Sequence, residues 1–184
     1  MIKQTLAALL LTTSVASAAD MMMNDKLDDQ NYVDVGAIFA ADEEVVQIGF
    51  SGRNGNVEYK AQYAEENDVS LIRTNLGAVV GKGNFGVSAG IGYTGVGADP
   101  LSGVESVGFT NGYVAAIYDG TKWEGRVQYN TEVADLNDTD TIELSTRFHV
   151  SDSWSLQASV ESSASDFSFE NDESLANLTV GYKF

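Results

Sequence analysis

Charged residues in this chain follow a two-residue period over most of its length. In ten successive segments between Val33 and Phe184, every second residue is uncharged, and nearly every charge within those segments occupies an intervening position. A helix repeats its side-chain pattern every three to four residues, whereas successive residues of a strand point to opposite faces of a sheet. The chain is therefore predicted to be all-β, with one uncharged and one ionic face on each strand.

The uncharged positions mark the expected strands. The sixth segment leaves its register open, because the frame that contains Tyr113 is as apolar as the frame that contains Val114. In chain order, the ten segments are residues 33–39, 46–50, 57–63, 72–80, 85–93, 114–118, 123–129, 142–150, 154–160 and 176–184.

The connections between these segments alternate in length. Four of them have the length and composition of tight turns, and the others are longer on the whole. Short turns at one rim and long loops at the other predict a transmembrane antiparallel up-and-down β-barrel with both termini at the periplasmic rim. Ten strands are expected, with eight or twelve as the alternatives. The turns are residues 52–56, 81–84, 119–122 and 151–153, and the longest loops are 95–107, 131–141 and 162–174.

The N-terminal residues precede the periodic pattern. Residues 1–18 combine the cation Lys3, an apolar run at 6–11 and the small residues that end at Ala18, which predicts a secretory signal peptide cut after Ala18. An uncleaved anchor helix is disfavoured, because the apolar run falls short of the roughly 20 residues that span a bilayer. Residues 19–30 have no period and are predicted to be a flexible lead-in to a barrel at 31–184. The sequence offers no support for a lumen plug formed by this stretch.

The uncharged face is expected to contact lipid. A soluble barrel or sandwich with that face turned inward is the alternative. Strands of about 8 to 11 residues match the length a tilted strand needs to cross a bilayer, and aromatic residues near both strand ends are typical of interfacial girdles. One predicted girdle holds Phe50, Tyr59, Phe85, Tyr118, Trp123, Phe148, Trp154 and Phe184, and the other holds Phe39, Tyr63, Tyr93 and Tyr129.

The last segment carries a recognisable motif. Residues 178–184 end in Phe184, with Val180 and Tyr182 at the alternate positions before it. This strand resembles the closing strand of Gram-negative outer-membrane β-barrels and porins. The resemblance covers 33–184 in pattern but only the final segment as a motif. It implies export to the outer membrane, contact with its lipid and lipopolysaccharide, and recognition of Val180, Tyr182 and Phe184 by the outer-membrane assembly machinery.

The opposite frame is expected to line the lumen. It holds five acids and five bases, so the interior is ionic yet close to neutral, and mutual pairing would remove most of the cost of enclosing these charges. The acids are Asp34, Glu58, Glu124, Glu143 and Glu161, the bases are Lys60, Arg73, Arg126, Arg147 and Lys183, and His149 shares their frame.

Barrel diameter sets the expected function. Eight strands leave an interior just filled by side chains, whereas sixteen to eighteen leave an aqueous channel. A ten-stranded barrel is therefore expected to be either a narrow porin-like channel for ions or very small solutes, or a structural envelope protein with an occluded polar lumen.

Acidic residues outside the lumen frame define an alternative function. They concentrate at the long-loop rim, where carboxylates could bind divalent cations or a partner outside the cell. Residues 135–140 have part of the spacing of a calcium loop but lack its central glycine and final glutamate. The net charge of -17 argues against a nucleic-acid partner.

An enzymatic function rests on one pair of residues. The spacing of His149 and Ser151 is similar to a pair in outer-membrane lipid A deacylases, which makes a lipid hydrolase the least favoured function. His149 has lumen parity near the short-turn rim, away from outer-leaflet lipid, so it is expected to pair with Glu143 or Glu161. We expect no enzyme activity, no cofactor and no metal site, since the chain has no cysteine and one histidine.

Overall fold

Ten antiparallel strands form one closed barrel in the computed structural model, which describes residues 27–40, 43–66, 69–98, 107–132, 140–164 and 174–184. The all-β prediction and the expected count of ten strands are confirmed. The strands are β1 (Gln30–Ala40), β2 (Glu43–Asn54), β3 (Val57–Glu66), β4 (Val69–Lys82), β5 (Phe85–Ala98), β6 (Val107–Asp119), β7 (Trp123–Glu132), β8 (Thr141–His149), β9 (Trp154–Ser163) and β10 (Leu175–Lys183).

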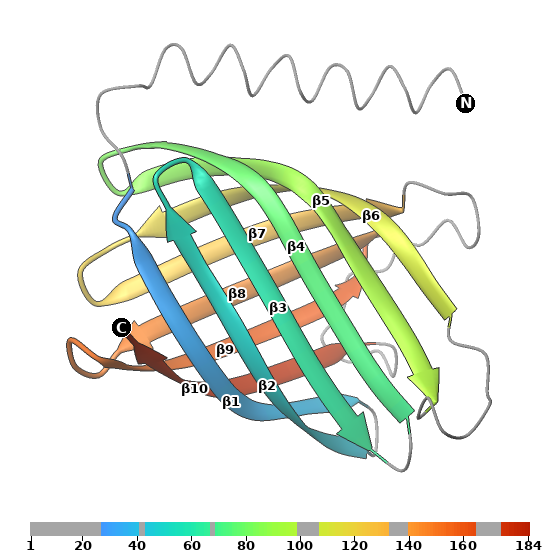
Figure 1. The fold of residues 1–184 in the computed structure, drawn as a ribbon. Helices are drawn as coiled ribbons and strands as arrows, with labels where there is room; N and C mark the ends of the chain where they lie inside the picture. The colour runs from blue at the N-terminus through green and yellow to red at the C-terminus, as the bar shows by residue number, and fades with distance from the viewer. Residues whose placement is uncertain (1–26, 41–42, 67–68, 99–106, 133–139, 165–173) are drawn as a thin grey trace, which may run out of the picture.

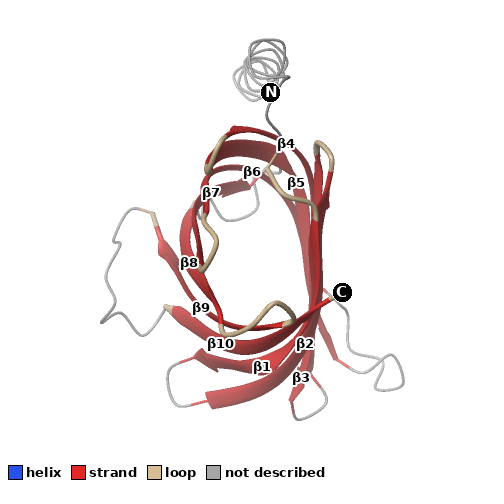
Figure 2. Cartoon of the chain, turned by 90° about the vertical axis from the view of Figure 1, so that its left-hand side faces the viewer, coloured by secondary structure: helices blue, strands red, loops and turns tan. Residues whose placement is uncertain are grey.

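Each strand pairs with its neighbours in sequence, and β1 pairs with β10 to close the ring. Figure 1 shows the tilted strands of the wall, and Figure 2 shows the ring of strands end on. At the seam, Val33 lies opposite Tyr182 and Ala37 lies opposite Leu178. Closure leaves no sheet edge unpaired, which is the condition for a sheet to exist in hydrocarbon.

The two faces of the wall differ as the sequence predicts. Large apolar side chains on the outward face remain exposed, as Leu76 does with 57% of its surface accessible. The sixth strand, whose register the sequence left open, turns Tyr113 inward with 3% exposure and Tyr118 outward with 41%. Among the described residues, no helix has the length and hydropathy that a membrane crossing requires.

Aromatic side chains meet around one end of the barrel. Directly opposed cross-strand pairs include Trp123 with Phe148 and Phe85 with Tyr118, whose ring centroids lie 4.6 and 5.3 Å apart. Phe184 joins this belt through Phe50, at 6.1 Å. The contacts agree with a continuous girdle of amphipathic rings near the connections at 55–56, 83–84, 120–122 and 150–153, which we name the short-turn rim.

Two of the four predicted turns are much tighter than expected. Gly55 and Gly83 adopt φ of 60° and 59°, a left-handed conformation that glycine tolerates and that two-residue hairpins require. The predicted turns at 52–56 and 81–84 therefore shrink to residues 55–56 and 83–84. As a result, Arg53 belongs to β2 instead of to a turn.

The acidic segments are divided between strands and connections. Glu44 lies in β2 and Glu65 lies in β3, so these two acidic residues belong to the barrel wall and not to the loops. The loop positions of the cation-binding hypothesis, including 135–139 and 165–173, lie outside the described residues, as does the predicted signal peptide at 1–18. The described part of the chain holds no cluster of three or more metal-ligating side chains.

Replacing Leu76 with arginine tests the assignment of the outer face. Leu76 is near the middle of β4. A cation that faces the lipid core at this depth costs a membrane barrel about 2–4 kcal/mol of unfolding free energy. Leu76→Arg is expected to lose that amount in urea titrations of the protein folded in phospholipid vesicles. Leu76→Ala is the control for side-chain loss, and equal stability of the two variants would contradict a lipid-facing position.

Candidate functional site

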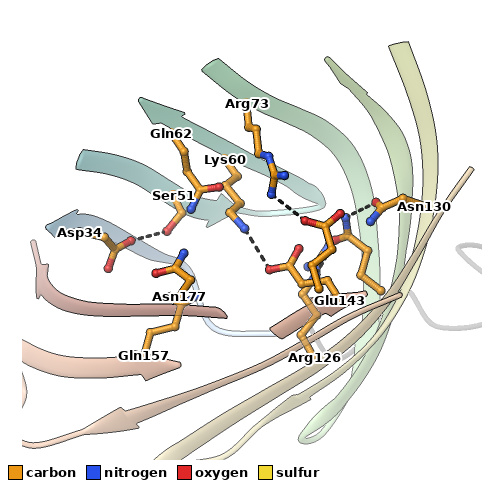
Figure 3. Close-up of polar contacts among 12 residues, drawn as sticks. Asp34, Ser51, Lys60, Gln62, Arg73, Arg126, Asn130, Glu143, Gln157 and Asn177 are labelled. Carbon is orange, nitrogen blue, oxygen red and sulfur yellow. Dashed lines mark hydrogen bonds and ion pairs between the residues drawn. The ribbon is translucent and has the colours of Figure 1, made fainter. Parts of the chain in front are cut away.

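Two ion pairs cross the full width of the lumen. Lys60 Nζ on β3 lies 3.2 Å from Glu143 Oε1 on β8, and these strands are five steps apart in either direction around the ring (Figure 3). Arg73 Nη1 on β4 donates to Glu161 Oε2 on β9 at 2.6 Å, again five steps apart. Opposite walls of the barrel are therefore joined through the interior, at a separation that these long side chains span.

A third pair is centred on Glu58, whose exposure is only 7%. Arg126 donates from Nη1 to Glu58 Oε2 at 2.9 Å and from Nη2 to Oε1 at 2.8 Å, in the bidentate geometry that guanidinium favours. The Tyr113 hydroxyl donates to the same carboxylate at 2.7 Å. A Cβ at Gly90 would lie 2.8 Å from the Tyr113 ring, so this glycine makes room for the tyrosine.

The most enclosed pair joins β1 and β8. Arg147 donates to both carboxylate oxygens of Asp34, at 3.0 and 3.1 Å, and to Ser155 Oγ at 3.0 Å. Its guanidinium carbon also lies 3.8 Å from the centroid of the Tyr32 ring, a cation–π contact. A Cβ at Gly181 would fall 2.5 Å from Asp34 Oδ1, so the absence of a side chain at this position admits the pair.

The only histidine has a different ion-pair partner from the one expected. His149 Nε2 lies 2.8 Å from Glu124 Oε1, whereas Glu143 and Glu161 have other partners. The expected pairing with either of those two was wrong, because Glu124 lies beside His149 at the same end of adjacent strands, whereas Glu143 and its cross-strand neighbour Glu161 lie near the opposite end of β8. Tyr32 completes the group by donating its hydroxyl proton to Glu124 Oε1 at 2.7 Å.

One interior pair was missed. Arg53 Nη2 on β2 lies 2.5 Å from Asp119 Oδ2 on β6, and both residues had been assigned to turns. The signal was present in the sequence, because Arg53 continues the inward frame of Gln47, Gly49 and Ser51. Lys183 is the last of the ten charged residues that were predicted to line the lumen. Its ammonium group lies 6.0 Å from the centroid of the Tyr32 ring.

The described side chains enclose at least two cavities in the lumen. One cavity of about 140 Å³ is lined by Tyr32, Asp34 and Arg147 among others, and a second of about 180 Å³ is lined by Arg73, Asn130 and Glu161 among others. The residues that line both cavities form a layer between them, which we name the middle layer. It consists of Lys60, Gln62, Asn75, Gln128 and Glu143.

Both cavities can hold water. Each is roomy relative to the space that one water molecule occupies, and most of the residues that line each cavity have a polar side chain. In the described part of the chain, Thr179 Oγ1 at the first cavity and Arg73 Nε at the second are buried without a hydrogen-bond partner. Water molecules beside these two atoms would provide their missing hydrogen bonds. Both cavities are therefore suited to hold water, one on each side of the middle layer.

Comparison with known proteins gives likeness in fold. No family model matches the sequence, and no curated protein matches it. Similar solved structures include the N-terminal β-barrel domain of Pseudomonas aeruginosa OprF, at 14% identity and a TM-score of 0.45, covering 86% of this chain and 100% of that one. Acinetobacter baumannii Omp33 is similar at 11% identity and a TM-score of 0.43, covering 87% and 100%. Escherichia coli outer membrane phospholipase A is similar at 12% identity and a TM-score of 0.38, covering 88% and 98%. The closed antiparallel barrel itself agrees with the architecture that the resemblance in the last strand implied.

Proposed function

We propose that this protein is an outer-membrane barrel whose lumen is a narrow, charge-balanced channel for ions or very small solutes. The observation that carries the proposal is the Lys60–Glu143 pair, which bridges opposite strands and lies between two polar cavities. A solute that moves from one cavity to the other must pass this pair. The middle layer therefore acts as the barrier to permeation.

Placement in the outer membrane is supported by the outside of the barrel. Its wall exposes apolar side chains such as Ile48, Leu76 and Ile91, each more than half accessible, while ionic side chains point inward. In water this arrangement would leave a large apolar surface unpartnered, whereas hydrocarbon removes that cost. Phe184 is exposed at the aromatic belt, where it is accessible to the assembly machinery that we propose recognises it.

The charge pairs limit both the size of the solutes that can pass and the selectivity of the channel between cations and anions. Each acid in the middle layer or beside it has a basic partner within 3.2 Å, so neither cations nor anions meet a large net field. Breaking such a pair in a confined interior is costly unless the passing ion or water replaces the lost contacts. Small hydrated ions can do so, and larger solutes cannot fit without displacing both side chains.

Planar-bilayer recording tests the proposal. The purified folded protein is expected to give small, brief conductance steps in the picosiemens range, because the middle layer interrupts the water path. Boiled protein is the control for contaminating channels, and slower or faster migration of unheated samples on gels verifies folding. Steady nanosiemens steps would contradict a closed middle layer, and the absence of any step would favour a purely structural role.

A hydrolase is not supported by the His149 region. The imidazole is engaged with Glu124, and the Ser151 hydroxyl accepts a hydrogen bond from the Trp154 backbone N–H at 3.1 Å. Ser151 thereby stabilises the turn between β8 and β9. A nucleophile would instead need a hydrogen bond to the histidine that activates it.

A further inference from the structure

The residues just before β1 enter the lumen at the short-turn rim. Leu27 is 3% exposed and packs with Val79 of β4 and Ile117 of β6, in the one buried apolar cluster of the described residues. Both strand residues point inward, and Ile117 also lines the first cavity. Leu27 therefore lies between that cavity and the end of the barrel.

Two glycines leave the space that Leu27 fills. A Cβ at Gly81 would lie 2.6 Å from Leu27 Cγ, and a Cβ at Gly86 would lie 2.5 Å from Leu27 Cδ1. Any larger residue at either position would collide with the leucine. The inner walls of β4 and β5 are thus shaped to receive this side chain.

The two residues that follow are tied to the rim of the wall. Arg53 Nε donates to the carbonyl oxygen of Asp28 at 3.0 Å, and the same guanidinium forms the pair with Asp119. The backbone N–H of Gly55 donates to Asp29 Oδ1 at 2.6 Å. Leu27 is consequently positioned by polar contacts on its C-terminal side, at β2 and at the β2–β3 turn.

We infer that residues 27–29 form a latch that closes the short-turn end of the lumen, with Leu27 as the seal. An apolar constriction in an otherwise polar pore excludes water and with it hydrated ions. Val79, Ile117 and Leu27 supply such a constriction, whereas the rest of the lumen is ionic. Its role in controlling permeation rests on the proposed channel function, but the exclusion of water does not.

An engineered disulfide tests whether Leu27 lies beside Gly86. The chain has no cysteine, so Leu27→Cys with Gly86→Cys provides the only two thiols. Leu27 Cγ, the position that a cysteine sulfur takes, lies 3.4 Å from where a Cβ at 86 would sit, which is suitable for a disulfide. Mild oxidation of the folded protein is expected to link the pair nearly completely. The control pair Leu27→Cys with Gly125→Cys, where position 125 has open surroundings on another strand, is expected to stay reduced. A Leu27–Gly86 pair that stays reduced would overturn the latch.

The seal is tested by access of water-soluble reagent to the cavity side. In an Ile117→Cys background, the anionic reagent sulfonatoethyl methanethiosulfonate is expected to react many-fold faster when Leu27→Ser is added, and no faster when Leu27→Met is added. Equal rates for the serine and methionine variants would overturn the seal. Conductance of the single variant Leu27→Ser, recorded separately, is expected to rise several-fold. If labelling accelerates while no protein conducts, the latch stands and the proposed channel function fails.

Discussion

Replacement of Arg147 by methionine is expected to remove about 3–5 kcal/mol of unfolding free energy. Methionine keeps much of the side-chain volume but leaves Asp34, with 8% exposure, as an enclosed carboxylate without its cationic partner. The cation–π contact with Tyr32 is lost as well. Urea titration in phospholipid vesicles, followed by tryptophan fluorescence, measures the loss.

A double variant separates charge from packing. Asp34→Asn added to Arg147→Met removes the unpartnered charge and retains an acceptor for the Ser51 hydroxyl, which donates to Asp34 Oδ2 at 3.1 Å. This double variant is expected to recover most of the lost stability. If it remained as unstable as Arg147→Met alone, the ion pair would not be the source of the effect.

Removal of the pair in the middle layer is expected to produce the largest change in conductance. Lys60→Ala with Glu143→Ala deletes both side chains that meet across the lumen, so the two cavities join into one continuous path. In a Leu27→Ser background, which opens the short-turn end, adding this double change is expected to raise conductance by about an order of magnitude, because an aqueous route replaces a desolvated one. Single-channel recording under symmetrical salt measures it.

The matched control removes one base and one acid elsewhere. Lys122 and Asp152 are exposed in the connections at the short-turn rim, so Lys122→Ala with Asp152→Ala changes net charge equally without altering the lumen. In the same Leu27→Ser background its conductance is expected to match that of Leu27→Ser alone. A Lys60–Glu143 change that conducts no better than this control would place the main barrier outside the middle layer.

The strands and their two faces could be predicted from sequence because each depends on local information. Alternation decides which face a residue takes, and lipid outside the ring makes the contrast sharp, as at Leu76 outside and Glu58 inside. Even the missed pair of Arg53 and Asp119 lies in the correct inward frame. The assignment of Arg53 failed because its hairpin turn uses two residues instead of five, and that of Asp119 failed because β6 extends to this residue.

Partners across the lumen could not be predicted, because they depend on how far each strand is offset from the next around the ring. Lys60 meets Glu143 only because the offsets of the five ladders between β3 and β8 add up to bring the two residues to the same level of the lumen. Leu27 was missed for another reason. It lies outside the periodic segments, and its position depends on the space beside Gly81 and Gly86, which the sequence does not display.

The cross-lumen pairs also discriminate between alternative alignments of neighbouring strands. A slip of two residues at any one ladder preserves which side chains face lipid, so hydrophobicity alone does not penalise it. That slip moves one strand by roughly 7 Å along its axis. Carboxylates and basic groups that now meet within 3.2 Å would then be separated beyond bonding distance. The interior charges therefore select one shear, the total offset of the strands around the ring. The apolar exterior alone does not determine it.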